Sequence, residues 1–291
     1  MPWLQLKLVT NAHEADQISD ALTDLGAVAV TYEDAADQPL FEPDPGETKL
    51  WQETRVVGLF EADADMDSII GQLKASLEQP PVHLSIDPLE DKDWTRAWMD
   101  TFKPIPCGQR LWIVPSWHSP TDPDAVNVVL DPGLAFGTGT HPTTALCLQW
   151  LDAHAPQDLQ VIDFGCGSGI LAVAAALLGA RHVWAVDHDP QALIATRDNA
   201  RKNGVADLIS TCLPADLPTL ETDLMLANIL ANPLIELAPQ FARLTKSGGT
   251  IVLSGILGHQ AEQVSERYRE WFEINPATLR EEWVELDGLR K

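Results

Sequence analysis

The hydrophobic pattern changes along the chain and divides it into two parts. In the first part, residues 3–9 alternate apolar and polar positions with the period of a strand, and residues 11–25 repeat apolar positions with the period of a helix. Similar patterns predict strands at 27–32, 54–60 and 82–86 and a helix at 66–77. The resulting order, β-α-β-β-α-β, is typical of a small ferredoxin-like α+β domain.

A connecting segment follows this first part. Trp94 and Trp98 are four residues apart and therefore share one face of a helix, which predicts that the connector packs against a neighbouring domain. Pro104 and Pro106 end that helix. The predicted organisation is a ferredoxin-like domain at 1–87, a helical linker at 88–103 and a second domain at 104–291.

The second part alternates short apolar strands with helical segments. Such alternation implies an α/β fold with a largely parallel sheet covered by helices on both faces, as in Rossmann-like domains. No helix separates 272–276 from 283–286, so these segments are predicted to form an antiparallel hairpin at the sheet edge. The other predicted strands are 111–114, 126–130, 160–163, 182–187, 208–212, 224–227 and 250–254.

The charge balance narrows the choice of partners. The chain has 43 acidic and 19 basic residues, a formal net charge of −24. This balance argues against nucleic-acid binding and against a polybasic membrane anchor, because both need a basic surface. Residues 1–87 contain 17 acids and 4 bases, a net charge of −13, so a basic partner is expected for the first domain.

The four cysteines, Cys107, Cys147, Cys166 and Cys212, form no C-x-x-C pair. Their spacing predicts neither a zinc site nor a disulfide framework, and free thiols fit a reducing cytoplasm. The N-terminus shows no secretory signal, and the longest apolar run, 170–178, is too short to cross a membrane. We therefore expect a cytoplasmic protein that binds no metal.

The strongest chemical signal is Val-Ile-Asp-Phe-Gly-Cys-Gly-Ser-Gly at 161–169, a strand followed by a glycine-rich turn and a helix. Gly165 and Gly167 allow the backbone to approach a ligand at the carboxyl end of a strand. A dinucleotide site requires Gly or Ala where this chain has Ile170, and the carboxylate of Asp163 would repel a pyrophosphate. The same carboxylate would attract a cationic cofactor that carries an amino group, which favours S-adenosylmethionine (SAM) over NAD.

A second strand ends in Asp187, 22 residues after Gly165. An acid at this place accepts hydrogen bonds from ribose hydroxyls, a role shared by NAD and SAM sites. Asp189 precedes Pro190 and is interpreted either as a further contact or only as a helix N-cap. Asp216, after the following strand, is a candidate for adenine contact or a simple loop acid.

Asn228 stands at the carboxyl end of another predicted strand, where a substrate would lie. Its amide oxygen can accept a hydrogen bond from an attacking amine and direct the lone pair of that amine at the methyl carbon. We therefore predict a catalytic role for Asn228. The alternative is an ordinary turn residue.

A loop rich in small residues lies upstream of the glycine motif and could fold over a ligand. Phe136 could stack on an adenine or cover the methyl group, and Gly137 and Thr138 belong to the same predicted cofactor contact. Thr144 falls in the first turn of a helix, where its hydroxyl could donate to the carboxylate of the cofactor. His141 is either a general base or a structural residue.

With these motifs the chain resembles class I SAM-dependent methyltransferases, and more closely the PrmA family, the bacterial methyltransferases of ribosomal protein L-eleven (L11). The resemblance covers nearly the whole length and is most specific at Gly-Leu-Ala-Phe-Gly-Thr-Gly-Thr-His, residues 133–141. It implies SAM contacts at Thr144, Gly165, Asp187 and Asn228.

The resemblance also implies the reaction. Members of the family transfer methyl groups from SAM to lysine ε-amines and the N-terminal α-amine of L11, with S-adenosylhomocysteine as the product and without a metal. The implied partner is L11 that is free, before ribosome assembly. The implied role of the first domain is substrate recognition.

The sequence departs from one related motif. Amide and adenine N-methyltransferases typically carry Asn/Asp-Pro-Pro-Tyr/Phe where this chain has Asn-Ile-Leu-Ala at 228–231. The aromatic side chain that stacks on a planar substrate is missing, which fits a flexible alkyl amine better than a nucleobase.

Alternatives remain at this stage. Another basic protein or a small-molecule amine could be the substrate. Among other classes, an NAD-dependent oxidoreductase conflicts with Asp163 and Ile170, and a non-catalytic binding module conflicts with the intact glycines and Asp187.

Overall fold

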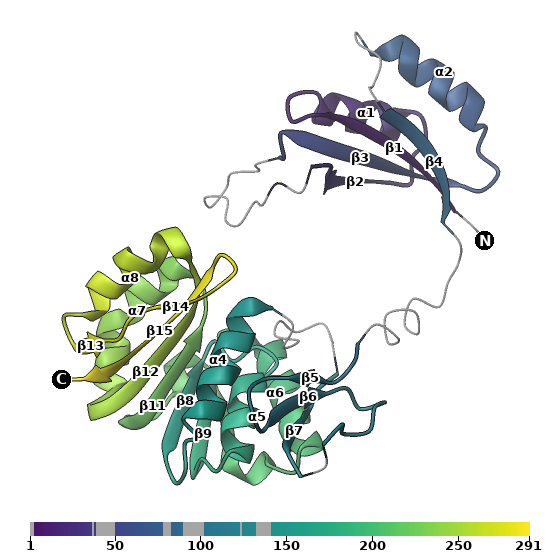
Figure 1. Cartoon of the computed structure of the whole chain (residues 1–291). Coiled ribbons are helices and arrows are strands. Elements are labelled where there is room, and N and C mark those ends of the chain that lie inside the picture. The colour runs from purple at the N-terminus through teal and green to yellow at the C-terminus, as the bar shows by residue number, and fades with distance from the viewer. Residues whose placement is uncertain are drawn as a thin grey trace. The chain divides into compact units, whose positions relative to one another are not determined.

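The computed structural model describes residues 3–36, 38, 50–77, 83–89, 102–122, 124–131 and 141–291. The chain forms two compact units, Met1–Met99 and Asp100–Lys291 (Figure 1). The predicted linker helix with Trp94 and Trp98 lies outside the described residues, as do Phe136, Gly137 and Thr138. No helix in the described ranges is both long and apolar enough to cross a membrane.

The front unit has the element order that its hydrophobic pattern predicts. Its elements are β1 (Trp3–Asn11), α1 (Ala15–Asp24), β2 (Ala29–Asp34), β3 (Glu53–Glu61), α2 (Met66–Ser76) and β4 (His83–Leu89). The strands form an antiparallel sheet in the order β2-β3-β1-β4. Both helices cover one face of this sheet, where Leu6, Leu8 and Phe60 pack against Ile18 and Leu73 (Figure 1).

Two boundaries in the front unit differ from the prediction. The side chain of Asn11 accepts hydrogen bonds from the N–H groups of His13 and Glu14, so it forms a turn at the end of β1, and α1 begins only at Ala15. Strand β4 continues to Leu89 through Pro88. An edge strand tolerates this proline because its outward side needs no hydrogen-bond partner.

The second unit is built on an eight-stranded sheet. Seven of its strands follow the order β10-β9-β8-β11-β12-β15-β13, and β14 pairs with β15. The strands are β8 (Gln160–Phe164), β9 (His182–Val186), β10 (Ile209–Cys212), β11 (Thr222–Asn228), β12 (Thr245–Leu257), β13 (Phe272–Ile274), β14 (Thr278–Arg280) and β15 (Trp283–Arg290). The five neighbouring strands β10, β9, β8, β11 and β12 are parallel, and β15 is antiparallel to its neighbours. This arrangement confirms the predicted parallel sheet with an antiparallel edge.

Helices cover both faces of this sheet (Figure 1). The helices are α4 (Pro142–Ala153), α5 (Ile170–Leu177), α6 (Pro190–Lys202), α7 (Ala231–Leu244) and α8 (Ala261–Tyr268). Helices α4, α5 and α6 contribute to one hydrophobic cluster, and α7 and α8 contribute to the other. Neighbouring residues on β11 face different clusters: Leu226 faces the first and Ala227 the second.

Two predicted strands belong elsewhere. Residues 111–114 and 126–130 were expected in the main sheet, but β6 (Leu111–Val114) and β7 (Val126–Val129) form a separate three-stranded sheet with β5 (Ile105–Pro106). Their apolar side chains, such as Ile113 and Val128, join the core beside α4 and α5. The pattern therefore reports burial correctly without identifying the sheet.

The order in which successive strands are added to the main sheet reverses beside β8. The chain passes from β8 to β9 and β10 on one side and then returns to place β11 and β12 on the other. In open parallel sheets, ligands bind outside the carboxyl ends of the strands at such a reversal. The ends of β8 and β11 are therefore the expected location of a cofactor.

Candidate functional site

A glycine-rich loop joins β8 to α5. Gly165, Gly167 and Gly169 have φ values of +79°, +53° and +77°, in the left-handed region that favours glycine. The N–H groups of Gly165 and Cys166 both donate to the carbonyl of Val186, at 2.7 and 3.1 Å, so the loop is anchored to β9. Gly169 then occupies the N-cap position of α5.

Helix α6 holds the same loop from a second side. The Thr196 hydroxyl donates to the carbonyl of Gly167 at 3.1 Å, and the Asn199 side chain donates to the carbonyl of Ser168 at 2.8 Å. Neither residue was predicted from the sequence to belong to the site. Their signal was a pair of polar residues three apart on the buried side of a helix, where apolar residues are usual.

Asp187, at the end of β9, supports the loop with both carboxylate oxygens. One oxygen accepts from the N–H of Gly167 at 2.9 Å, and the other accepts from the N–H of Asp189 at 3.0 Å. The neighbouring Asp189 accepts from the N–H of Gln191 and is the N-cap of α6, as the structural alternative predicted. Asp216 lies exposed in a short 3₁₀ turn, Pro214–Asp216.

Asp163 is buried beneath the loop. Its side chain is 1% exposed, and one carboxylate oxygen accepts from the N–H of Ala172 at 3.0 Å. The other oxygen, Oδ1, has no hydrogen-bond partner among the described residues. Burial raises the pKa of this carboxyl to about 7, against the lowering effect of the Ala172 N–H, and the charge of Asp187 raises it further. An orphaned buried acceptor of this kind is suited to a cationic donor.

The structure brings Asn228 and Thr144 together from positions 84 residues apart. The Asn228 amide nitrogen donates to the Thr144 hydroxyl at 3.3 Å. Thr144 is 3% exposed in the first turn of α4. This contact orients the amide, and its oxygen is the atom of the Asn228 side chain that can accept a hydrogen bond from a substrate amine.

Ile229, the residue after Asn228, packs between two glycines and thereby fixes the position of Asn228. A Cβ atom on Gly165 would collide with the Ile229 side chain, and a Cβ atom on Gly255 would collide with the Ile229 carbonyl. Gly255 has a φ of +85° and lies at an irregularity in the pairing of β12 with β15. The Ile229 side chain is thus packed against the cofactor loop, and the Ile229 backbone is packed against β12.

His141 serves as the N-cap of α4. Its Nδ1 accepts from the N–H of Thr143 at 3.4 Å and lies 2.8 Å from the Thr143 hydroxyl. The imidazole also contacts the Trp283 ring edge-on, with centroids 4.9 Å apart. These contacts support the structural interpretation of His141.

The described site residues therefore converge on one edge of the sheet. Asp163 lies near the end of β8, Gly165 and Gly167 follow that strand, Asp187 follows β9, and Asn228 ends β11. Within the described ranges, no group of three or more His, Cys, Asp or Glu side chains could hold a metal ion.

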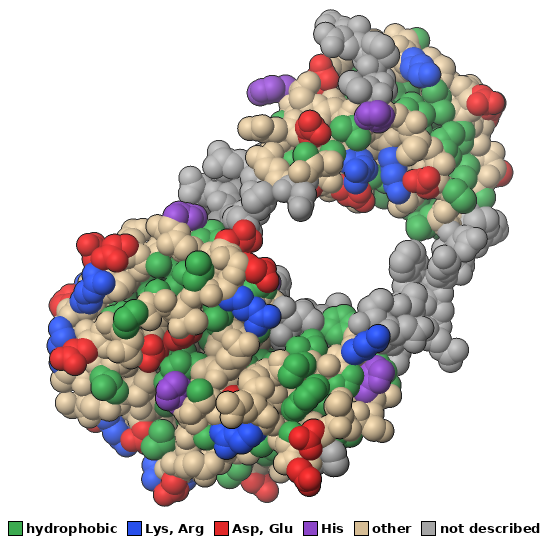
Figure 2. All heavy atoms as spheres, in the orientation of Figure 1, with side chains coloured by type: hydrophobic (Ala, Val, Ile, Leu, Met, Phe, Trp, Pro, Cys, Tyr) green, Lys and Arg blue, Asp and Glu red, His purple; other side chains and the backbone are tan. Residues whose placement is uncertain are grey.

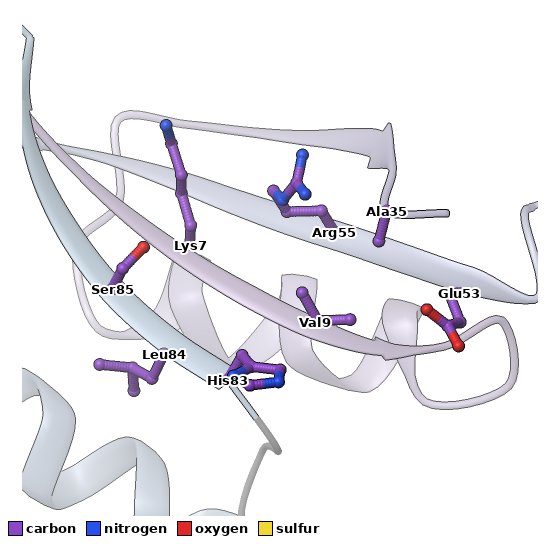
Figure 3. A pocket seen from close by; sticks show the side chains of 8 residues that line it. All are labelled: Lys7, Val9, Ala35, Glu53, Arg55, His83, Leu84 and Ser85. Atoms are coloured by element: carbon purple, nitrogen blue, oxygen red, sulfur yellow. The ribbon is translucent and has the colours of Figure 1, made fainter. Parts of the chain in front are cut away.

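The front unit has a pocket of its own, of about 550 Å³, on the sheet face opposite its helices (Figure 3). Lys7 and Arg55 both line it. Lys7 pairs with Asp87 at 2.9 Å and Arg55 with Glu33 at 3.4 Å. Blue and red side chains accordingly lie side by side on the visible part of this unit (Figure 2). The two basic side chains of the pocket are thus neutralised by acidic partners, and none of the predicted cofactor residues lines it.

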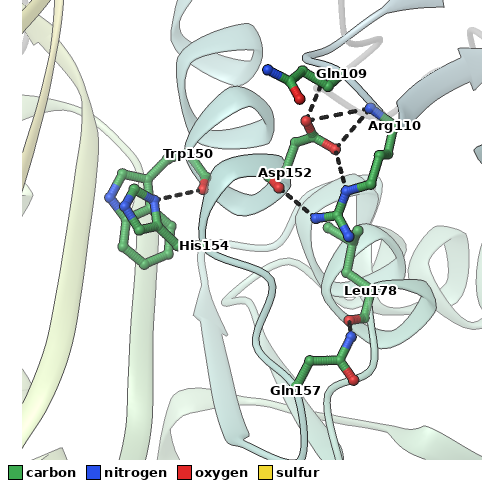
Figure 4. A network of polar contacts seen from close by, with 7 residues as sticks. All are labelled: Gln109, Arg110, Trp150, Asp152, His154, Gln157 and Leu178. Carbon is green, nitrogen blue, oxygen red and sulfur yellow. Dashed lines mark hydrogen bonds and ion pairs between the residues drawn. The ribbon is translucent and has the colours of Figure 1, made fainter.

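A polar network ties the start of the second unit to the end of α4 (Figure 4). Asp152 is 5% exposed and accepts from the N–H groups of Gln109 and Arg110, at 2.6 and 3.2 Å. The Arg110 guanidinium donates to the Asp152 carbonyl at 2.6 Å. A Cβ atom on Gly108 would collide with Asp152. The network fixes the helix whose other end carries Thr144.

Comparisons with known proteins agree with this geometry. A family model described as "Ribosomal protein L11 methyltransferase (PrmA)" matches residues 2–291. The chain is 54% identical to the ribosomal protein L11 methyltransferase of Marinobacter nauticus, over 100% of this chain and 99% of that protein. It is 55% identical to those of Photorhabdus laumondii (100% and 99% covered) and Shewanella sp. strain ANA-3 (100% of both).

One solved structure shares the architecture. The crystal structure of ribosomal protein L11 methylase from Lactobacillus delbrueckii subsp. bulgaricus superimposes with a TM-score of 0.60 and is 36% identical. The match covers 65% of this chain and 100% of that one.

Proposed function

Because the chain belongs to the ribosomal protein L11 methyltransferase (PrmA) family, we propose that it transfers methyl groups from SAM to amino groups of ribosomal protein L11. The amino groups are lysine ε-amines and the N-terminal α-amine. The observation that carries the proposal is the 3.3 Å contact of Asn228 with Thr144, which leaves an amide oxygen to receive an amine beside the glycine loop.

The residues at the edge of the sheet fit SAM. The Asp163 oxygen that has no partner among the described residues can accept from an ammonium group, and the glycine loop allows close approach of a ligand. Each Asp187 oxygen has a second lone pair for a ribose hydroxyl, and the Thr144 hydroxyl can donate to the cofactor's carboxylate. Phe136, Gly137 and Thr138 complete the proposed contacts.

When bound, SAM supplies an electrophilic methyl group on a sulfonium. Alignment of the amine with that methyl group contributes most of the rate, and the Asn228 oxygen provides it by accepting an N–H from the neutral amine. An unperturbed lysine has a pKa of about 10.4, so it must first lose a proton. Burial next to a positive sulfonium lowers the pKa of the lysine, and water can take the proton.

The front unit is the proposed ferredoxin-like recognition domain, acting on free L11 in the cytoplasm. Its net charge of −13 over residues 1–87 supports a basic partner. On α1, the exposed acids Asp16, Asp20 and Asp24 have no ion pair with any described basic residue. These acids are available to a basic protein, whereas the acids around Lys7 and Arg55 are neutralised.

The test is methylation of ribosomal proteins. The purified protein is incubated with SAM labelled in the methyl group and with total ribosomal proteins from a strain that lacks the enzyme. We expect label in L11, on lysine residues and on the N-terminal amine. Label in a different basic protein, or in none, would refute the substrate assignment.

A further inference from the structure

We propose that the hairpin of β14 and β15, together with Leu230, forms a docking lip for the lysine-bearing segment of the protein substrate. The lip consists of Thr278–Trp283 and Leu230. This inference rests on the proposed function and deepens it, because it assigns a second contact surface, on the unit that carries the chemistry.

The lip stands at the end of the sheet where the reaction is proposed to occur. Trp283 pairs with Leu257, the last residue of β12, and three residues earlier on β12 Ser254 pairs with Asn228. The Trp283 ring contacts His141, which caps the helix that carries Thr144. The hairpin is therefore continuous with the proposed site through β12 and α4.

Two apolar side chains of the lip are left in solvent. Leu279 is 65% exposed, the highest value among the large hydrophobic side chains in the described part of the chain, and Leu230 is 49% exposed. Leu230 lies only two residues after Asn228 and precedes α7. A lysine side chain has an apolar stem of four methylene groups, which covers such surface while its amine extends beyond it.

The turn of the hairpin keeps two acids at a conformational cost. Glu281 and Glu282 form a two-residue loop between the paired residues Arg280 and Trp283. Glu281 has a φ of +57°, a conformation that two-residue hairpin loops usually assign to Gly, Asn or Asp. Such strain is typical of functional sites. Both glutamates are exposed, and their charge is complementary to an ammonium group.

The charges at the lip favour a lysine-bearing segment of the substrate over a second copy of the chain. Arg280 is the basic residue of the segment Thr278–Trp283, and together with Glu281 and Glu282 it gives this segment a net charge of −1. A second copy would bring a surface of net charge −24 against these acids. A lysine-rich segment brings positive charge and aliphatic carbon, the two properties that the lip complements.

The first test reverses the charge of the lip. Glu281→Lys with Glu282→Lys is compared with Glu273→Lys, which changes an exposed acid on β13, at the other end of β15. Kinetics are measured with purified L11 and with a lysine-containing peptide, and SAM affinity is measured by calorimetry. We expect the KM for the amine substrate to rise by about 10-fold in the lip variant, with SAM affinity unchanged.

The second test removes the apolar contact. Leu279→Ser is compared with Leu289→Ser, because Leu289 is also an exposed leucine, at 49%, but lies near the end of β15 that is far from the turn. We expect a KM increase of about 3-fold for Leu279→Ser and none for Leu289→Ser. Equal kinetics for the lip variants and their controls would overturn the proposal.

A third variant separates function from folding. Glu281→Gly removes the strain at φ +57°, so a purely structural turn predicts a higher Tm and normal kinetics. The docking lip predicts a higher Tm together with a raised KM. If the wild type methylates the peptide but not L11, the proposed substrate is refuted and the docking lip is not. The lip is tested by comparing the KM of the lip variants with the KM of their control variants, and this comparison can be made with either amine substrate.

Discussion

The two units of the molecule differ in whether the described residues of their cores include carboxyl groups. In the front unit, ion pairs such as Lys7–Asp87 lie at the surface, where water weakens them, and the apolar core occupies one face of the sheet. The second unit also has surface ion pairs, such as Arg201–Asp198, but it buries several carboxyl groups as well. Asp163 and Glu285 are 1% and 3% exposed, and each has one oxygen without a hydrogen-bond partner in the described residues.

This difference separates recognition from chemistry. A surface with many hydrated acids attracts a basic partner over a distance, and the attraction depends on salt. A buried carboxyl interacts strongly with nearby charge and depends on pH instead. The two units should therefore respond to different perturbations.

The largest effect is expected where backbone segments touch in the second unit. Gly255→Ala should lower the free energy of unfolding by about 4 kcal/mol, because it combines a left-handed φ of +85° with a collision against the Ile229 carbonyl. Gly248→Ala is the matched control, since Gly248 has a φ of +75° but open space around it. Its cost should be about 1–2 kcal/mol. Equal losses in urea denaturation would show that the Ile229 contact contributes nothing.

The next effect concerns turnover. Asn228→Ala should lower kcat by about 100-fold, because the amine loses the acceptor that aligns it. SAM affinity should fall much less, whereas Asp187→Ala should abolish measurable SAM binding, since it also releases the Gly167 N–H. Single-turnover rates and calorimetry separate the two. A normal methylation rate in Asn228→Ala would contradict the positioning role.

The third effect is a pH dependence of stability. Burial, and then the charge of Asp287, raises the pKa of Glu285 to about 7, above its unfolded value. The folded state holds this proton more tightly, so the stabilisation is complete below the unfolded pKa and is lost as pH rises through 7. In the wild type the free energy of unfolding should decline between pH 5 and pH 8, and Glu285→Gln should remove about 2 kcal/mol of that decline.

The measurement is the free energy of unfolding at several pH values. The variant is compared with Glu273→Gln, an exposed acid on the neighbouring strand. A pH profile of Glu285→Gln that parallels the wild type would show that Glu285 is not the titrating group.

The smallest effect is a salt dependence. Raising the salt concentration from 50 to 300 mM should weaken binding of L11 by a few-fold, because exposed acids of the front unit are screened. SAM affinity should stay nearly constant, since its proposed partners Thr144, Asp163 and Asp187 are buried. Fluorescence titration of L11 and calorimetry of SAM at both salt concentrations test this. A larger salt effect on SAM than on L11 would reverse the comparison between the units.

The sequence predicted the parts of the site that are contiguous along the chain. The stretch from Asp163 to Gly169 contains strand, turn and helix start within a few residues, so its pattern identified the loop directly. The same holds for Asp189, whose place before a proline already indicated an N-cap. Local backbone chemistry determines such features, and local sequence reports them.

Strands were harder to assign than loops. Hydrophobic periodicity measures burial, and β6 and β7 are buried against helices in a sheet separate from the main one. Strand β14 was not predicted because its three residues are all exposed and carry no apolar pattern. Its pairing with β15 stabilises it without burying its side chains.

By itself, then, the sequence determined the two-part organisation, the parallel sheet with its antiparallel edge, and the glycine loop with Asp163. Only the tertiary structure decided that Asn228 meets Thr144 across 84 residues, that Ile229 fits between Gly165 and Gly255, and that Thr196 holds the loop. The reason is physical. Periodicity and turn chemistry act between neighbours in sequence, whereas these contacts arise when the strand ends are brought to one edge of the sheet.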